Sequence, residues 1–324
     1  MNPSRQPLYL DCDTGVDDTL ALAYLLASPE IDLVGVGTVS GNVAAAQAAR
    51  NTLDLLDLAG RQDVPVALGA HDRLTGTYGG GVPHIHGHNG VGDVDLPQSQ
   101  RQVEGQDAAA FLVDLARAHE GRLRIVAVGP LTNLAKALEL EPALPGMVRE
   151  VTIMGGAALV PGNVSAVAEA NVAGDPEAAA LVLAAPWDVT LVPLDVTMEN
   201  TFEEEHRQAL LTSGDPFVET VGRILDVYFD FHVPELGRRA SALHDPLAAA
   251  VAVGGVLPSS APRVPVVVDA TGGPGRGQTL CDLRGQRLGQ VDHPGARVRV
   301  VLSTSEPLAP HLVDRLLQRA RVSA

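Results

Sequence analysis

Lysine is nearly absent from this chain: Lys136 is the only one among 23 basic residues, against 39 acidic residues, and the formal net charge is −16. A protein this acidic lacks the positive charge that follows a phosphate backbone, which argues against nucleic-acid binding. Cysteine occurs only as Cys12 and Cys281, without a CxxC pair. Neither a disulfide framework nor a zinc–thiolate site is therefore indicated.

Long apolar runs are also missing, so no stretch of the sequence is expected to cross a bilayer. Residues 1–6 are too short and too polar for a secretory signal, and we therefore expect a cytoplasmic protein without membrane attachment. The sequence shows no domain linker, repeat or low-complexity tract. We predict a single domain over residues 1–324.

The sequence does contain β-branched apolar runs that alternate with alanine-rich stretches. Strands are predicted at Leu8–Asp11, Leu33–Val39, Val64–Leu68, Leu123–Val128, Val151–Met154, Val189–Leu194 and Val264–Val268, with strand-like runs near Leu280 and Val298. Helices are predicted at Thr19–Leu26, Val43–Leu58, Ala108–His119, Leu131–Leu140, Pro176–Ala184, Glu203–Leu211, Leu247–Val253 and from about Pro307, and an irregular loop at Gly69–Gln106. The alternation predicts an α/β fold with an open, mostly parallel sheet covered by helices on both faces. Ligands bind such sheets beyond the carboxyl ends of the strands.

Four carboxylates crowd the end of the first predicted strand, in the segment Asp11-Cys12-Asp13-Thr14-Gly15-Val16-Asp17-Asp18. Helix capping or turn formation accounts for any one of them. For all four together, repulsion and desolvation add, and a bound cation between them is the simpler explanation. Calcium and magnesium take oxygen ligands, so a site for a hard cation is favoured.

Other polar residues stand among apolar neighbours later in the chain. Asp245, in His244-Asp245-Pro246, suits either a helix N-cap or a further metal ligand, and His244 suits an acid poised near neutral pH. Asn163, Glu169 and Asn171 suit either a hydrogen-bonded loop or contacts to sugar hydroxyls. The histidines at 84, 86 and 88 lack matching ligands, so one histidine reaching an active site is favoured over a zinc site.

Taken in order, these segments resemble the inosine-uridine nucleoside hydrolase family. The acidic segment from Asp11 to Asp18 matches its DxDxxxDD signature. The further matching segments, in the family's order and at similar spacing, are Ser40-Gly41-Asn42, Gly129-Pro130-Leu131-Thr132-Asn133-Leu134, Met154-Gly155-Gly156, Gly162-Asn163, Ala168-Glu169-Ala170-Asn171, Asp175-Pro176-Glu177-Ala178 and His244-Asp245-Pro246.

The resemblance implies a Rossmann-like nucleoside hydrolase fold and calcium-dependent hydrolysis of the N-glycosidic bond of ribonucleosides to ribose and free base. The implied calcium ligands are the carboxylates of Asp13, Asp18 and Asp245 and the backbone carbonyl of Val128. Asp13 is also implied to activate the attacking water, and His244 to assist the leaving base. The residues matched to substrate contacts are Asp17, Asn42, His86, Met154, Asn163, Glu169 and Asn171. Asp11 acquires no direct role and is expected to support the metal site through hydrogen bonds. Relatives form homodimers or homotetramers, which is implied here too.

Two departures from the family bear on base preference. Phe231 stands where several base-nonspecific members have a tyrosine, and the only tryptophan, Trp187, is expected in the core rather than against a purine. These points favour a pyrimidine or mixed preference.

Two alternative functions remain at this stage. One is a phosphatase of the haloacid dehalogenase type, whose chemistry needs a lysine that only Lys136 could supply. The other is a calcium-dependent nucleoside-binding protein without turnover.

Overall fold

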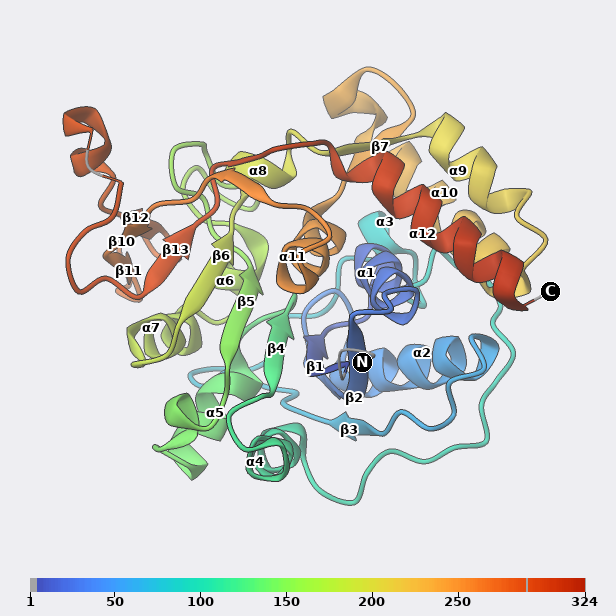
Figure 1. Ribbon diagram of the computed structural model, residues 1–324, viewed down its shortest axis with the longest axis horizontal. Coiled ribbons are helices and arrows are strands. Elements are labelled where there is room, and N and C mark those ends of the chain that lie inside the picture. The colour runs from blue at the N-terminus through green and yellow to red at the C-terminus, as the bar shows by residue number, and fades with distance from the viewer. Residues whose placement is uncertain (1–4, 290, 324) are drawn as a thin grey trace.

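An eight-stranded sheet forms the centre of the structure, a computed structural model that describes residues 5–289 and 291–323 (Figure 1). Its strands, in spatial order, are β10 (Arg263–Val264), β13 (Val298–Val300), β6 (Val189–Val192), β5 (Glu150–Met154), β4 (Arg124–Ala127), β1 (Gln6–Cys12), β2 (Ile31–Thr38) and β3 (Val66–Leu68). All neighbouring strands are parallel except β10, which pairs antiparallel with β13 at one edge. The predicted α/β fold with a mostly parallel sheet is confirmed.

Helices cover both faces of this sheet (Figure 1). One apolar cluster packs residues of α1 (Val16–Leu26), α2 (Ala45–Leu58), α10 (Pro216–Leu236), α11 (His244–Val253) and α12 (Leu308–Ser323). The other packs residues of α4 (Ala108–His119), α5 (Thr132–Leu140) and α7 (Pro176–Ala184). Strand β1 serves both clusters, because side chains alternate along a strand: Leu8 and Leu10 join the first, and Tyr9 the second.

Shorter elements surround the carboxyl ends of the strands. They are helices α3 (Pro83–His86), α6 (Ala170–Gly174), α8 (Leu194–Thr197) and α9 (Glu204–Leu211), and the strand pairs β7 (Thr201–Glu203) with β8 (Ala240–Ala242), β9 (Pro258–Ser260) with β14 (Ser303–Thr304), and β11 (Val266–Val268) with β12 (Thr279–Cys281). Within the described part of the chain, no helix combines the length and apolarity needed to cross a membrane. Of the polar N-terminal segment 1–6, residues 1–4 lie outside the described residues.

Several element boundaries differ from the sequence prediction, and three of these differences change how an element is assigned or where it begins or ends near the site. The single strand predicted at Val264–Val268 is wrong: it divides around Pro265 into β10 of the large sheet and β11 of a separate pair, since proline has no N–H to continue a ladder. The strand predicted to reach Leu194 ends at Val192, and Leu194 begins α8. The helix predicted from Leu247 begins three residues earlier, at His244.

The longest helix, α10, was not predicted at all. It spans 21 residues from Pro216 to Leu236. Its start follows a known pattern, because the Asp215 carboxylate accepts hydrogen bonds from the backbone N–H groups of Phe217 and Val218 and proline occupies the first position. Pro234, in the last turn, interrupts the helical pattern of the sequence. This helix matters because it forms one wall of the cavity described next.

Candidate active site

A cavity of about 740 Å³ opens beyond the carboxyl ends of the central strands. Its walls come from the segments that follow β1, β2, β4, β5 and β6, and from α3, α10 and α11. Ten of the site residues expected from the sequence line it: Asp17, Asn42, His86, Val128, Met154, Asn163, Glu169, Asn171, His244 and Asp245. Segments more than two hundred residues apart in the chain thus meet at one place, where an α/β sheet binds its ligands.

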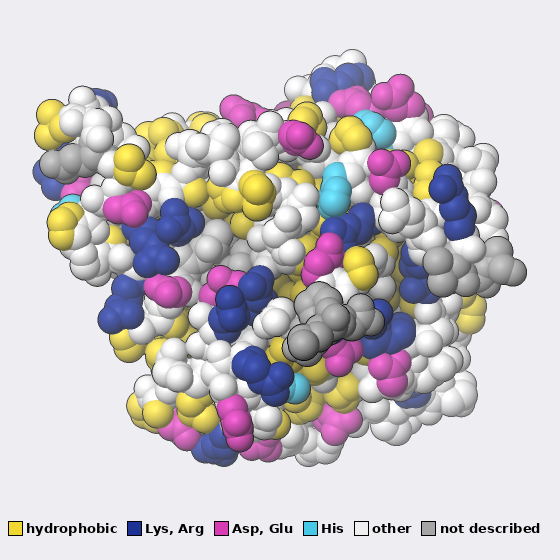
Figure 2. Space-filling view, viewed as in Figure 1, with side chains coloured by type: hydrophobic (Ala, Val, Ile, Leu, Met, Phe, Trp, Pro, Cys, Tyr) yellow, Lys and Arg dark blue, Asp and Glu magenta, His cyan; other side chains and the backbone are white. Residues whose placement is uncertain are grey.

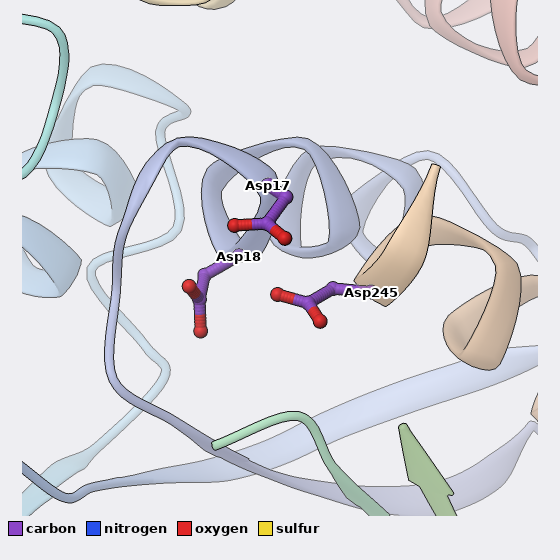
Figure 3. A group of neighbouring side chains, drawn as sticks. All are labelled: Asp17, Asp18 and Asp245. Carbon is purple, nitrogen blue, oxygen red and sulfur yellow. The ribbon is translucent and has the colours of Figure 1, made fainter. Parts of the chain in front are cut away.

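Three buried carboxylates, those of Asp17, Asp18 and Asp245, lie together, and Asp17 and Asp245 form part of the floor of the cavity (Figure 3). Asp17 and Asp18 belong to the first turn of α1, and Asp245 is the second residue of α11. One oxygen from each of the three lies within 4.8 Å of the others. Asp18 also caps its helix, because its Oδ2 accepts from the Gly15 N–H at 2.8 Å. Asp245 is a helical residue and not the N-cap, which is Leu243.

Asp13 lies beside this group but is not one of its three members. Its backbone N–H donates to Asp18 Oδ1 at 3.1 Å, and its Oδ2 accepts from the Asn42 N–H at 2.6 Å. The Asp13 side chain borders a second, smaller cavity of about 240 Å³, which shares Asn42 and Asn171 with the large one. Asp13 therefore borders the smaller cavity and is linked to the larger one through Asn42, which lines both.

The electrostatics of this floor are those of a cation site. Burial, with repulsion from the neighbouring carboxylates, raises the pKa of Asp13 and Asp245 and raises the pKa of Asp18 to about 7. Asp13 Oδ1 and Asp17 Oδ1 are buried and accept no hydrogen bond from any described residue. In the same part of the chain, no arginine or lysine forms an ion pair with any of the four carboxylates. A bound cation fits this donor set, because it would satisfy the orphaned oxygens and offset the repulsion.

The acidic residue nearest this group in sequence, Asp11, is directed elsewhere. It is fully buried, and its Oδ2 accepts from the Tyr9 hydroxyl and from Asn133 Nδ2, each at 3.0 Å. Neither partner belongs to the carboxylate group, so the Asp11 side chain makes no hydrogen bond to the residues expected to hold the metal.

The amide of Asn171 ties two strand ends together. Its Nδ2 donates to the backbone carbonyl of Val128 at 2.8 Å and to that of Met154 at 3.2 Å. The Val128 carbonyl, expected as a metal ligand, thus lies at the cavity wall and accepts from a residue expected to bind ribose. Asn171 and Met154 are in contact, as their shared role against a sugar would require.

Glu169 and Asn163 are held by the loop that contains them. The Glu169 carboxylate caps α6 and accepts from the backbone N–H groups of Gly156, Asn171 and Val172, at 2.8, 2.8 and 3.1 Å. Burial raises its pKa, and these hydrogen bonds act in the opposite direction. Asn163 Oδ1 accepts from the Ala170 N–H at 3.0 Å. The internal hydrogen-bonded loop is therefore real, and it also presents both side chains to the cavity.

The opposite wall is built from imidazole and aromatic rings. His86 Nδ1 accepts a hydrogen bond from the Val16 N–H at 3.0 Å, so the proton of the neutral ring is on Nε2. The same Nδ1 atom lies 3.9 Å from Asp17 Oδ1, which is too far for a hydrogen bond. The Tyr228 ring lies 5.3 Å from that of His86, and its hydroxyl donates to Asp17 Oδ2 at 3.3 Å. His232 Nδ1 carries its proton, since its partner at 2.9 Å is the Tyr228 carbonyl.

Tyr228 and His232 are lining residues that the sequence analysis missed. Their only signal is the cluster of rings in Tyr228-Phe229-Asp230-Phe231-His232, which becomes readable once α10 is recognised. Phe231 is 38% exposed and borders the cavity edge-on to His84 and His232. Trp187, in contrast, is buried in the core as predicted, where its indole N–H donates to the Val182 carbonyl at 2.8 Å.

His244 begins α11 and borders the cavity beside Asp245. Its Nδ1 lies 2.8 Å from the Thr197 hydroxyl. Burial lowers the pKa of His244 to about 4, despite the opposing effect of Asp17. This shift favours a neutral imidazole, and the expected role of His244 as an acid stays a prediction.

Comparison with known proteins explains this arrangement. The sequence model of the family described as "Inosine-uridine preferring nucleoside hydrolase" matches residues 8–308. The chain belongs to this family. It is 35% identical to the inosine-uridine preferring nucleoside hydrolase of Crithidia fasciculata over 285 residues, 86% of this chain and 89% of that protein. It is 36% identical to uridine nucleosidase 1 of Arabidopsis thaliana over 243 residues, 75% of this chain and 72% of that protein.

A solved structure gives the same result for the fold. The purine-preferring ribonucleoside hydrolase of Gardnerella vaginalis superimposes with a TM-score of 0.90 at 33% identity, covering 98% of this chain and all of that one. The protein is accordingly a nucleoside hydrolase, an enzyme that acts on N-glycosyl bonds. Lys136, which the phosphatase alternative required, is on α5 and lines neither described cavity. That alternative is excluded.

Proposed function

We propose that this nucleoside hydrolase is calcium-dependent and cleaves ribonucleosides of pyrimidine or mixed base type to ribose and free base. The observation that carries the proposal is the meeting of Asp17, Asp18 and Asp245 at the floor of the cavity. Three buried acids without a cationic partner in the described chain are costly unless a cation is bound. The irregular set of oxygen donors suits calcium better than an ion that demands strict octahedral geometry.

The resemblance to the family, and not the cluster alone, supplies the proposed ligands: Asp13, Asp18, Asp245 and the carbonyl of Val128 would hold the ion, with Asp17 beside them. When bound, calcium supplies positive charge that acidifies an attacking water and orients the ribose 2′- and 3′-hydroxyls. Asp17, Asn42, Met154 and the loop residues Asn163, Glu169 and Asn171 surround the remaining space, where a ribose fits. A site whose buried polar groups match both hydroxyls rejects a deoxyribose strongly.

Asp13 is the residue that receives the proton of the attacking water. Its Oδ1 is buried and has no hydrogen-bond partner among the described residues, so this oxygen is available to accept a proton. Water then attacks C1′ on the face opposite to the base, as in single-displacement glycoside hydrolysis. The developing positive charge of the sugar is stabilised by the carboxylates of Asp17 and Glu169.

The leaving base would occupy the wall formed by His86, Tyr228 and His232, with His244 assisting its departure. Trp187 is in the core, so no tryptophan is available to stack on a purine. This supports a pyrimidine or mixed preference, while the names of the relatives range from uridine to purine substrates. We also propose a cytoplasmic homodimer or homotetramer, on the resemblance to the family alone.

Release of reducing sugar from uridine, cytidine, inosine and adenosine, with and without calcium, tests this function. We expect calcium-dependent release from the ribonucleosides, fastest with uridine or cytidine, and none from 2′-deoxyuridine. Binding of ribonucleosides without release from any of them would contradict the hydrolase and leave a nucleoside-binding protein. Equal rates after exhaustive chelation would remove the metal from the proposal.

A further inference from the structure

A buried threonine lies behind the histidine at the cavity wall. Thr197 ends α8, is 0% exposed, and places its hydroxyl 2.8 Å from Nδ1 of His244. The adjoining backbone is fixed as well, because the Leu243 N–H donates to the Asn200 carbonyl at 2.8 Å. Segment 194–200 therefore holds both the backbone before His244 and the inner edge of its ring.

The direction of this hydrogen bond follows from the partners of the hydroxyl. Within the described part of the chain, His244 Nδ1 is the only hydrogen-bond partner of the Thr197 hydroxyl. If Nδ1 carried a proton, the hydroxyl hydrogen would be buried without an acceptor, which is costly. If Nδ1 is unprotonated, the hydroxyl donates to it and both groups are satisfied. The Thr197 hydroxyl is thus the donor.

This assignment determines what the other ring nitrogen can do. A neutral imidazole with an unprotonated Nδ1 has its single proton on Nε2. Thr197 occupies the Nδ1 edge, and His244, which is 8% exposed, is one of the residues that line the cavity. The Nε2–H is then the group that faces the space proposed for the leaving base.

We propose that Thr197 is a positioning residue that fixes His244 in the Nε2–H tautomer, so that the neutral ring donates a hydrogen bond to the leaving base. The inference rests on the proposed hydrolase function and deepens it. Stabilisation comes from the hydrogen bond itself, and no proton moves between Thr197 and His244. Loss of the hydroxyl would allow Nδ1 to take the proton, leaving an acceptor where the base needs a donor.

Kinetics with two leaving groups test the role of the hydroxyl. Thr197→Val keeps the size of the side chain and removes the donor. We expect a roughly tenfold to hundredfold fall in kcat on uridine, with little change in KM, because the lost interaction acts on the departing base. The loss on a nitrophenyl riboside, whose leaving group needs no such help, should stay within about threefold. Thr197→Ser restores a hydroxyl and should recover most of the loss.

Thr220→Val is the matched control, because Thr220 is a buried threonine of α10 whose hydroxyl donates to the Pro216 carbonyl. It should lower stability without distinguishing the two substrates. In Thr197→Val/His244→Ala, the loss on uridine should equal that of His244→Ala alone, because both changes remove one hydrogen bond. Equal losses on both substrates in Thr197→Val, no recovery in Thr197→Ser, or additive losses would each overturn the proposal.

A measurement on the resting protein separates this proposal from the function it rests on. In long-range ¹H–¹⁵N NMR spectra, His244 should show a pyridine-like Nδ1 and a pyrrole-like Nε2 in the wild type, and a mixture of tautomers in Thr197→Val. A protonated Nδ1 in the wild type refutes the role of Thr197 even if nucleosides are cleaved. The expected tautomer in a protein that cleaves no nucleoside refutes only the hydrolase function.

Discussion

The two sides of the cavity differ in whether their buried polar atoms have hydrogen-bond partners. On the acidic side, Asp13 and Asp17 each keep a buried oxygen without a partner in the described structure. On the imidazole side, the Nδ1 atoms of His86 and His232 are bound to backbone groups, the Val16 N–H and the Tyr228 carbonyl. One side is electrostatically incomplete and needs a cation, whereas the other is complete and presents fixed donors and acceptors.

The difference assigns different work to the two sides. Unpaired carboxylates in a low-dielectric site interact strongly with a cation and with the charge that develops on a sugar. We propose that the rings held by backbone bonds and by packing determine which base fits and how it is oriented. We therefore expect changes on the acidic side to affect turnover of all substrates, and changes on the imidazole side to affect the ratio between substrates.

Asp13→Asn should have the largest effect, and it tests directly whether the acidic side controls turnover. The change keeps the shape of the side chain but removes the base and one proposed metal ligand, so kcat on uridine should fall by roughly a hundredfold to ten-thousandfold. Asp11→Asn is the matched control, since Asp11 is equally buried, lies two residues earlier and hydrogen-bonds Tyr9 and Asn133. It should lower the melting temperature while kcat changes by less than about threefold.

Activity of Asp13→Asn within about tenfold of the wild type would show that Asp13 neither receives the proton nor holds the metal. Equal losses in the two variants would show that any buried carboxylate of this strand matters only for folding. Steady-state kinetics with a melting curve for each variant distinguishes these outcomes.

Metal removal tests whether the buried carboxylates of the acidic side depend on a bound cation for stability. Burial raises the pKa of Asp18 from 3.8 to about 7 in the metal-free protein. The folded state then binds the proton more tightly than the unfolded state, so the contribution of Asp18 to stability is complete below about pH 4 and is lost as the pH rises through 7. The chelated protein should melt on the order of 5 °C lower at pH 8 than at pH 5, and calcium should restore it at pH 8. A melting temperature that rises with pH after chelation would contradict the claim that these buried carboxylates destabilise the metal-free protein when they are charged.

The contrast between the two sides also explains what the sequence could predict. Asp13, Asp17 and Asp18 lie within six residues at a strand end, and a local motif predicts local convergence. For Asp245 the residues alone left a helix N-cap and a metal ligand open, and only the family pattern favoured the ligand, because nothing local indicates that α11 packs on α1. Asn163 and Glu169 stood out as polar residues among apolar neighbours, but the particular hydrogen bonds of their loop became known only from the fold.

Most residues of the imidazole side could not be predicted from the sequence, for a physical reason. Tyr228 and His232 are on α10, and their roles depend on how that helix packs against α3, which places Tyr228 beside His86. Tautomers are equally unreadable from sequence, because they are set by single backbone partners such as the Val16 N–H. The strand break at Pro265, by contrast, could have been predicted from the proline alone.

Tyr228 contacts both sides of the cavity. Removing its hydroxyl while keeping its ring should give the smallest effect, and it tests whether sugar and base are recognised by different walls. The hydroxyl donates to Asp17 on the acidic side, while the ring packs on His86 on the imidazole side. Tyr228→Phe removes only the hydroxyl and should lower kcat/KM by roughly threefold to tenfold for uridine, cytidine and inosine alike, because Asp17 is proposed to contact the sugar common to all three. Phe231→Leu, a change confined to the imidazole side, should alter the ratio of kcat/KM among these substrates by about twofold to fivefold while the best substrate changes little. A Tyr228→Phe variant with altered base ratios, or a Phe231→Leu variant with uniform losses, would mean that sugar and base are not recognised by separate walls.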